Sequence, residues 1–416
     1  MALRIERKRC GERLNRTNIL FVANGHGENA IAARIAGALP DAAAEPLRVE
    51  LLSLVGVGVW ADGLAVVGPR RALPSGGLVA MGNVRAFGRD VVAGFPALLA
   101  AQLGFLRRAH RRYAAVVAVG DAYALGLALL TGMKPVFVGT AKSVFVARYG
   151  PLERLLLRRA ATVYVRDEPT AHDLVAHGVM AEAPGNVIAD LARPEPPALP
   201  GTWIGLLPGS RESAYADAVR LGRVARALAA RRPHLGALRS VAPALDARRL
   251  IGALERDGCT IGPNSLAGPN VTPAGPHAAP AESPPMPMFE ARAGPARLAG
   301  WSGPLGALLA ASSIVLGQAG TANEQAAAQG LPVIALEGTG KREDWYRMRQ
   351  RRLLGEALLL VPAQPRAAAA AIEALLADPA HMRHMSEAGR RRIGPPGGAE
   401  RIARGIVSVA RNRAAC

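Results

Sequence analysis

Short apolar runs recur along the chain, and polar or glycine-containing turns separate them. The first run is NILFVA at Asn18–Ala23, followed by a turn at 24–29 and by a helical pattern through Leu39. Runs without polar alternation are typical of strands that are buried on both faces of a parallel sheet. The order of strand, glycine-containing turn and helix therefore predicts the opening of a βαβ unit.

The same order recurs in both halves of the chain, which predicts an α/β fold with open sheets. Helices are expected from about Ser213 to Ala230 and over Ala322–Gln329. Further strands are expected at Arg48–Leu54, Ala115–Val119, Pro135–Val138, Thr162–Val165, Trp203–Leu207, Ser313–Leu316 and Pro332–Leu336.

A proline-rich stretch divides the two halves. The sequence RPEPPALPG at Arg193–Gly201 has four prolines in nine residues, which favours an extended connector. We therefore expect an N-terminal domain at 1–195, a C-terminal domain at 196–390, and a final helix at 391–416 that packs back on the N-terminal domain. Residues 262–303 are rich in Gly, Pro and Ala and are expected to form an irregular loop.

The chain is strongly basic, with a net charge of +19 from 51 Lys and Arg and 32 Asp and Glu residues. Only four of these residues are lysines, so the arginine excess fits a coding bias as well as an anionic partner. Aromatic residues make up 4% of the chain, too few for a base-stacking platform, and nucleic acid is not expected as a partner. The three cysteines have no short spacing, which excludes a disulfide framework and suits a reducing compartment.

Two long uncharged stretches are poor candidates for membrane spans. Tyr113–Met133 carries Asp121 at its centre and is expected to form a strand, a turn and a helix at Ala122–Leu130. Val91–Leu106 is short and is broken by Pro96. We therefore expect a soluble, cytoplasmic protein. The apolar stretch with a basic end at 91–112 predicts either an interfacial amphipathic helix or an ordinary core helix.

The first glycine-rich turn contains Gly25, His26, Gly27, Glu28 and Asn29. Glycines let the backbone approach a ligand closely, and the helix that follows presents free N–H groups. The six-residue dinucleotide pattern is incomplete, because a third glycine is missing. His26 is a candidate general base, and the alternative is that it only packs in or caps the turn.

Asp121 directly follows an apolar strand. Open α/β sheets bind ligands at the carboxyl ends of their strands, so this carboxylate is expected to face a ligand and to be able to deprotonate a hydroxyl. An Asp at this position also suits the N-cap of the helix that follows. The two roles are compatible.

The second half offers two comparable turns. Gly209, Ser210 and Arg211 combine backbone N–H groups, a hydroxyl and a guanidinium, which suit a diphosphate, whereas the alternative is a plain helix cap by Ser210. In the turn at 317–324, Thr321 is expected to cap the helix and to form a capping box with Glu324. The same carboxylate could accept both O–H groups of a ribose.

Several motifs of other enzyme classes are missing from the sequence. It has no Asp-x-Asp pair, no P-loop, no His-Glu-x-x-His and no Gly-x-Ser-x-Gly. Kinase, metalloprotease and α/β-hydrolase functions therefore lose support, and no metal is expected.

Two motifs together resemble lipid-A-disaccharide synthase and its relatives among the GT-B glycosyltransferases: LLPGSR at Leu206–Arg211 and GQAGTANEQAAAQGLPVIAL at Gly317–Leu336. The segment APGNVIAD at 183–190, which contains Asn186, matches a late segment of the first domain of that family. VANGHGENAIAARI at 22–35, VGDAYAL at 119–125 and FVGTAKS at 137–143 resemble a bacterial subgroup described as lipid-A-disaccharide-synthase-related.

The resemblance implies two Rossmann-like, doubly wound domains that face each other across a cleft. The C-terminal domain would hold a UDP-sugar, and no metal or other cofactor is implied. An N-acetylglucosamine-type sugar would be transferred with inversion to a lipid or lipid-linked acceptor at the inner face of the membrane. The enzyme would thus be a hexosyltransferase that is peripheral to the cytoplasmic membrane.

The resemblance also implies roles for individual residues. Asp121 or His26 would be the base, and the His resembles the glycine-rich-loop histidine of the undecaprenyl-linked GlcNAc transferase. The implied substrate-binding residues are Gly25, Gly27, Glu28, Asn29 and Asn186, then Gly209, Ser210 and Arg211 at the diphosphate, and Gly320, Thr321, Glu324 and Gln325 at the phosphate and ribose. The alternatives are a UDP-GlcNAc 2-epimerase-like enzyme on the same scaffold, or a nucleotide-sugar-binding protein without catalysis.

Overall fold

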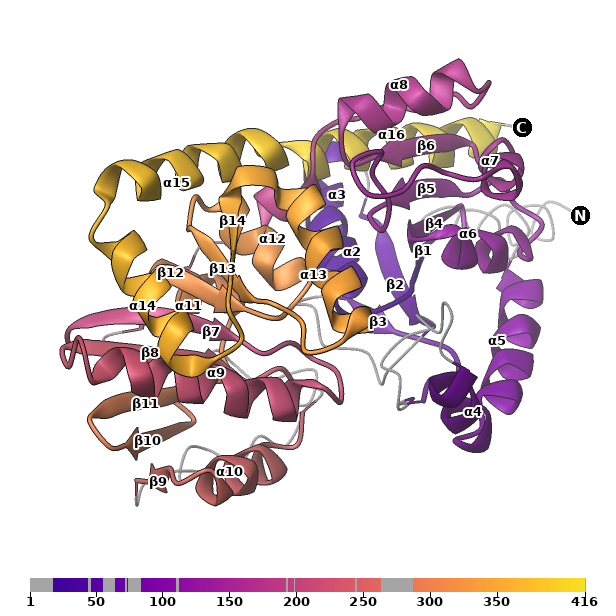
Figure 1. Cartoon of the computed structure of the whole chain (residues 1–416). Helices are drawn as coiled ribbons and strands as arrows, with labels where there is room; N and C mark the ends of the chain where they lie inside the picture. Colours follow the sequence, from indigo (N-terminus) through magenta and orange to yellow (C-terminus); the bar gives the residue numbers. More distant parts are fainter. Residues whose placement is uncertain are drawn as a thin grey trace, which may run out of the picture. The chain divides into compact units, whose positions relative to one another are not determined.

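The chain forms two compact units in the computed structural model (Figure 1). Unit 1 comprises Met1–Leu191 and Gly394–Cys416, and unit 2 comprises Ala192–Ile393. Unit 1 is therefore built from two separate stretches of chain, and unit 2 from one. The structure describes residues 18–43, 46–54, 64–71, 73, 84–109, 112–191, 194–197, 199–243, 245–262 and 287–415.

Unit 1 is built on a six-stranded parallel sheet in the order β3-β2-β1-β4-β5-β6. The order reverses between β1 and β4, which lie side by side, and this reversal is where open α/β sheets bind ligands. The predicted strands of this half are confirmed to within a residue at each end. The strands are β1 (Asn18–Ala23), β2 (Arg48–Ser53), β3 (Ala65–Val66), β4 (Ala115–Gly120), β5 (Val136–Gly139) and β6 (Thr162–Val165).

Helices cover both faces of this sheet, as its uninterrupted apolar strands require. Leu20, Val116 and Phe137 face a core shared with α5, α6, α7 and α8, whereas α16 packs with α2, α3 and β4. The helices of unit 1 are α2 (His26–Gly37), α3 (Leu39–Ala42), α4 (Val84–Val92), α5 (Phe95–Ala109), α6 (Ala122–Leu129), α7 (Pro151–Leu157), α8 (Glu168–Ala176) and α16 (Gly398–Ala415), with a 3₁₀ turn η1 (Val187–Asp190).

Residues 91–109 do not form one continuous helix. The stretch is divided between α4 and α5, and Gly94 separates the two helices with a positive φ of 91°. Phe95, Leu98 and Leu106 of α5 are buried in the cores of unit 1. One side of α5 is therefore packed in the core, as the core-helix alternative requires, and a seat at a membrane interface stays a prediction. No helix in the described part of the chain combines the length and the hydrophobicity that a membrane crossing needs.

Unit 2 contains an eight-stranded sheet in the order β14-β13-β12-β7-β8-β11-β10-β9. Strands β14 to β11 of this order run parallel, whereas β10 is antiparallel to both of its neighbours. The strands are β7 (Thr202–Leu207), β8 (Leu235–Ser240), β9 (Thr260–Ile261), β10 (Phe289–Ala293), β11 (Ala296–Trp301), β12 (Ser312–Gly317), β13 (Val333–Leu336) and β14 (Leu358–Val361).

The expected irregular loop at 262–303 is partly wrong. Residues 263–286 lie outside the described residues, but 289–301 form the hairpin of β10 and β11. Burial alternates strictly along β10, so Phe289 and Ala291 point into the core while Glu290 points to solvent. This alternation is the mark of an antiparallel strand with one solvated face.

The helices of unit 2 also cover both faces of its sheet. Leu221, Leu250 and Ile372 place α9, α10 and α14 against one common core. The helices are α9 (Ala214–Ala229), α10 (Ala247–Arg256), α11 (Leu305–Ala310), α12 (Thr321–Ala328), α13 (Lys341–Leu354), α14 (Pro365–Leu376) and α15 (Pro379–Ile393), with a 3₁₀ turn η2 (Gly355–Ala357).

The chain returns to unit 1 at α16. Asp190 receives hydrogen bonds from the backbone N–H groups of Gly397 and Ala399, the second at 2.7 Å, and so caps the start of this helix across 207 and 209 positions of sequence. Arg34 of α2 forms an ion pair with Glu400 of α16. These contacts attach α16 to unit 1 at its N-terminal end.

Candidate functional site

The carboxyl ends of β1 and β4 bring Asn24 and Asp121 together at the reversal point of unit 1. The Asn24 amide donates to Asp121 Oδ2 at 3.0 Å, across 97 positions of sequence. The other carboxylate oxygen, Oδ1, accepts from the backbone N–H groups of Tyr123 and Ala124, each at 3.1 Å. Asp121 is therefore the N-cap of α6, as one of its two predicted roles requires.

The protonation of Asp121 reflects two opposing effects. Burial raises the pKa of this carboxyl above its ordinary value, while the hydrogen bonds from Ala124, Asn24 and Tyr123 act to lower that pKa. Burial is the larger effect. A carboxylate with a raised pKa accepts a proton more readily than a carboxylate with the ordinary pKa. Asp121 can therefore cap α6 and still act as a base, its second predicted role.

Two glycines bring Glu28 to the same place. Gly25 is the N-cap of α2 with a φ of 145°, and a Cβ added there would lie 2.5 Å from Glu28 Oε2. Gly120 has a φ of 128°, and its Cβ would lie 3.2 Å from Glu28 Cγ and 3.8 Å from Asn24 Cβ. The structure thus gathers Glu28, Asn24 and Asp121 at one end of the sheet, and both glycines leave the space that Glu28 occupies.

Other predicted residues of this unit have structural partners. Asn29 is 1% exposed, and its amide donates to Ser53 Oγ at 3.0 Å, so it ties α2 to β2. Asn186 caps η1 by accepting from Ile188 N at 3.2 Å. His26 is the first residue of α2, and its side chain lies outside the described residues, so its role as a base stays a prediction.

Sequence reasoning missed Asn24, Thr140 and Tyr149 at these strand ends. Thr140 N donates to Gly120 O at 3.0 Å, which places the residue after β5 beside the residue before Asp121. Tyr149 reaches back over β5 and is 3% exposed. Asn24 and Thr140 lie within the segments at 22–35 and 137–143 that carry the family resemblance, and each directly follows an apolar strand, but neither was singled out there. Tyr149 belongs to none of the quoted motifs.

In unit 2, the turns after β7 and β12 lie next to each other. A Cβ added to Gly209, whose φ is 105°, would lie 4.0 Å from Ala319 Cα. Gln318 N donates to Leu207 O at 2.9 Å and extends the pairing of the two strands into the turns. The two glycine-containing turns of the second half are thus adjacent within unit 2.

The predicted helix caps in unit 2 are wrong. Gly320 is the N-cap of α12 and makes no side-chain cap, and Thr321 is the first helical residue, so the capping box with Glu324 does not form. In the other turn the N-cap of α9 is Ser213, which leaves Ser210 and Arg211 ahead of the helix. The N–H groups at the start of α12 therefore lack a capping side chain, which is the local geometry of an anion site.

The turn at 317–320 is supported by α13. Arg347 is 9% exposed and donates to Gln318 O at 3.0 Å. Asn323 donates to Gly317 O at 3.2 Å and to Gln350 Oε1 at 3.3 Å. Arg347 and Gln350 were missed because the basic run at 347–352 predicts a solvated helix face. In fact Arg347 lies on the buried stripe of α13 that also contains Leu354, seven residues later.

The remaining predicted residues differ in exposure. Glu324 and Gln325 are each 7% exposed in the first turns of α12, whereas Arg211 is exposed. The exposed guanidinium of Arg211, ahead of the helix, can extend to a diphosphate. The buried carboxylate of Glu324 can accept hydrogen bonds from a ribose only if the ribose lies directly against the first turn of α12. Among the described residues, no cluster of His, Cys, Asp and Glu has a metal-binding arrangement.

Comparison with known proteins finds similarity in structure only. No protein-family model matches the chain, and no curated protein matches its sequence. The UDP-GlcNAc 2-epimerase from Methanocaldococcus jannaschii is similar over 94% of this chain and 99% of its own, with a TM-score of 0.51 and 12% identity. The UDP-GlcNAc 2-epimerase from Neisseria meningitidis bound to UDP-GlcNAc is similar over 95% and 98%, with a TM-score of 0.52 and 12% identity.

A UDP-glucosyltransferase from Polygonum tinctorium, capable of glucosylating indoxyl, is similar over 95% of this chain and 98% of its own, with a TM-score of 0.52 and 13% identity. These likenesses show the fold. The chain has the two-domain α/β architecture of the GT-B type, as predicted, and the more specific resemblance to lipid-A-disaccharide synthase stays a prediction.

Proposed function

We propose that this protein is an enzyme that acts on a UDP-linked N-acetylhexosamine without a metal ion. The observation that carries the proposal is the pair of adjacent glycine turns in unit 2, where Gly209 approaches Ala319 at the uncapped start of α12. Free N–H groups at a helix start bind phosphate, and Glu324 in the first turn is the acid for the ribose. The sequence has no Asp-x-Asp pair through which a metal would hold a diphosphate.

The reaction that the comparisons favour is epimerisation at C2 of the sugar, because two of the similar structures are UDP-GlcNAc 2-epimerases. Inversion at C2 requires the C2–H bond to break and a new C–H bond to form on the opposite face. One group must accept a proton and another must return one. Asp121 and Glu28, two carboxylates at the same strand ends, are the candidates for these roles in unit 1.

Transfer of the sugar to a lipid or lipid-linked hydroxyl is the second candidate, and it rests on the motifs at 206–211 and 317–336. The acceptor oxygen would form a bond to the anomeric carbon, its proton would pass to Asp121 or His26, and the bond to UDP would break. Arg211 and the start of α12 would stabilise the charge that develops on UDP. A lipid acceptor would bring the protein to the inner face of the cytoplasmic membrane.

The first experiment tests the donor class. Thermal shift and saturation-transfer NMR are measured with UDP, UDP-GlcNAc, ADP and GDP at equal concentrations. A response to the uridine compounds alone supports the proposal. Equal responses to all four nucleotides, or none to UDP, would refute the assignment of Arg211 and Glu324.

The second experiment separates the two reactions. The protein is incubated with UDP-GlcNAc in D₂O without any acceptor, and the sugar is followed by proton NMR. Epimerisation predicts a second UDP-sugar with deuterium at C2. A transferase predicts no change until an isoprenoid- or lipid-linked acceptor is added, when UDP is released. Binding without either reaction would indicate a nucleotide-sugar-binding protein.

A further inference from the structure

Three strand ends of unit 1 form a row in register. Ala23 of β1 pairs with Val119 of β4, so Asn24 comes level with Gly120, and Gly120 pairs with Gly139 of β5. Residues in register on parallel strands project from the same face of the sheet. The row thus consists of one amide side chain and two glycines at the carboxyl ends of three neighbouring strands.

Polar groups from other elements occupy the space above both glycines. Glu28 lies over Gly120, as described above. A Cβ added to Gly139 would lie 2.5 Å from Tyr149 Oη and 2.9 Å from the ring of Phe137. Gly139 has an ordinary φ, so the need for glycine here is one of space alone. The hydroxyl of Tyr149 and the carboxylate arm of Glu28 therefore lie over neighbouring positions of one row.

Three polar atoms at these strand ends are buried and find no hydrogen-bond partner among the described residues: Asn24 Oδ1, Thr140 Oγ1 and Tyr149 Oη. Asn24 is 8% exposed and Tyr149 is 3% exposed. Because Asp121 can only accept, Asn24 must present its NH₂ group there, which leaves Oδ1 as a free acceptor. Leaving such atoms unpaired destabilises a fold by about 1–3 kcal/mol each, so their concentration at a strand edge needs an explanation.

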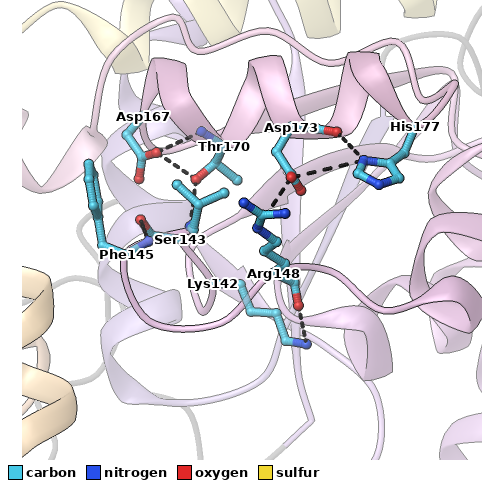
Figure 2. A network of polar contacts seen from close by, with 9 residues as sticks. Lys142, Ser143, Phe145, Arg148, Asp167, Thr170, Asp173 and His177 are labelled. Atoms are coloured by element: carbon cyan, nitrogen blue, oxygen red, sulfur yellow. Dashed lines mark hydrogen bonds and ion pairs between the residues drawn. The ribbon is translucent and has the colours of Figure 1, made fainter.

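The hydroxyl of Tyr149 is held in place from outside the row. The Lys142 ammonium lies 5.6 Å from the centre of the Tyr149 ring and forms an ion pair with Glu153 at 2.5 Å. The loop that carries Lys142 and Tyr149 is fixed on α8 by two contacts. Thr170 Oγ1 accepts from Val144 N at 3.1 Å, and Arg148 pairs with Asp173 at 3.4 Å, and Figure 2 shows how Arg148, Thr170 and Asp173 lie. A rigid hydroxyl loses little conformational entropy when it binds a ligand.

The chemistry of the three atoms matches hydroxyl groups. Burial and the negative charges of Glu153 and Asp121 raise the pKa of Tyr149, so its phenol stays protonated and can donate at neutral pH. Thr140 can donate or accept, and Asn24 Oδ1 accepts. A sugar hydroxyl is both donor and acceptor, whereas a phosphate would meet Asp121 and Glu28 and be repelled.

We propose that Asn24, Thr140 and Tyr149 form a subsite of unit 1 that binds hydroxyl groups of a sugar beside Asp121. Tyr149 donates to one hydroxyl, and Asn24 accepts from another while it orients Asp121. This inference rests on the proposed function for the identity of the sugar, which is the N-acetylhexosamine of the donor or a glycosyl acceptor. The burial of the three atoms, and their lack of a hydrogen-bond partner among the described residues, do not depend on the identity of the sugar.

The test is Tyr149→Phe in the full chain, with Tyr164→Phe as the matched control, since Tyr164 is also a buried tyrosine of unit 1 but lies beside α16. We expect Tyr149→Phe to leave the melting temperature of the free protein unchanged or raised, because an unpaired hydroxyl is removed. We expect UDP affinity to stay unchanged and affinity for UDP-GlcNAc, and for free N-acetylglucosamine by saturation-transfer NMR, to fall about 3- to 10-fold. The control should change none of these.

Two results would overturn the subsite. If Tyr149→Phe lowers the melting temperature by several degrees and leaves sugar affinity unchanged, the hydroxyl is bonded within the fold. If the wild-type protein binds UDP-GlcNAc no more tightly than UDP, the sugar adds no affinity and unit 1 has no sugar subsite. Failure of the proposed function is separate, because it would appear as no UDP binding by the wild-type protein, and the free-sugar titration and melting measurement would still test Tyr149.

Discussion

Arg239 is buried in β8, where no described carboxylate forms an ion pair with it, and its replacement by methionine should stabilise unit 2. The residue is 1% exposed, and its Nη2 donates a hydrogen bond to Ala218 O at 3.1 Å. Its Nε and Nη1 find no partner among the described residues. The nearby Asp257 is already engaged by Arg223 and Arg226. Arg239→Met keeps the length of the aliphatic stem and removes the charge.

The magnitude follows from the pKa of the guanidinium. Burial lowers the pKa of Arg239 from 12.5 to about 10. Each pKa unit corresponds to about 1.4 kcal/mol, so the charged form is destabilised in the folded state by about 3 kcal/mol. Loss of the hydrogen bond to Ala218 offsets part of the gain, which leaves an expected stabilisation of about 1–3 kcal/mol. For a unit of this size, the melting temperature should rise by about 2–4 °C per kcal/mol.

Urea unfolding followed by tryptophan fluorescence is the suitable assay, since Trp203, Trp301 and Trp345 all lie in unit 2. The midpoint should rise with an unchanged slope. Arg223→Met, which removes a half-exposed arginine, is the control and should change stability by less than about 1 kcal/mol.

The pH dependence gives a second check. The unfolded state holds the Arg239 proton more tightly, so wild-type stability should rise relative to the variant as the pH passes upward through about 10. A lower midpoint for Arg239→Met at neutral pH would refute the reasoning, because it would mean that the charge is compensated in the fold.

Four further changes test the sites. Glu324→Ala should weaken UDP binding about 10-fold by calorimetry because a hydrogen-bonded carboxylate is lost, and unchanged affinity would refute the ribose role. Asp121→Asn keeps a good N-cap, so the melting temperature should stay within about 2 °C while turnover falls at least about 100-fold. Wild-type activity should fall as the pH drops through the pKa of Asp121, which burial raises above 3.8. Normal turnover of the Asn variant would refute the role of Asp121 as a base. Asp190→Ala should lower the stability of unit 1 by about 1–3 kcal/mol in chemical unfolding, and a neutral effect would contradict its capping of α16. Gly139→Ala should displace Tyr149, reduce stability by about 1–3 kcal/mol and lower sugar affinity as Tyr149→Phe does, and a neutral result would contradict the close packing.

Buried parallel strands were predictable from sequence because an uninterrupted apolar run has few other uses. Asn18–Ala23 and Thr162–Val165 were located to the residue. The hairpin of β10 and β11 was missed although FEARA alternates with period two, because the Gly- and Pro-rich sequence before it masks the signal in any longer window. Composition thus predicted irregularity where local alternation indicated a strand.

The candidate site was predictable only where its residues follow strands. Asp121 was found because it comes directly after an apolar run, and the glycine turns were found for the same reason. The N-cap of α12 was predicted one position too late, at Thr321, because Gly320 takes the N-cap and helix ends are poorly defined by sequence. Tyr149 and Arg347 reach their places through tertiary packing, which no local pattern encodes.

The discontinuity of unit 1 has a consequence for how the chain folds during synthesis. Unit 2 is one continuous segment and can complete its fold as soon as residue 393 has left the ribosome. Unit 1 begins first but finishes last, because α16 covers part of its sheet and Asp190 must wait for the N–H groups of Gly397 and Ala399. At the usual rates of translation, about 5–20 residues per second, the uncovered face of the nascent sheet would be exposed for about 10 seconds or longer. This order reverses the usual one, in which N-terminal domains fold first.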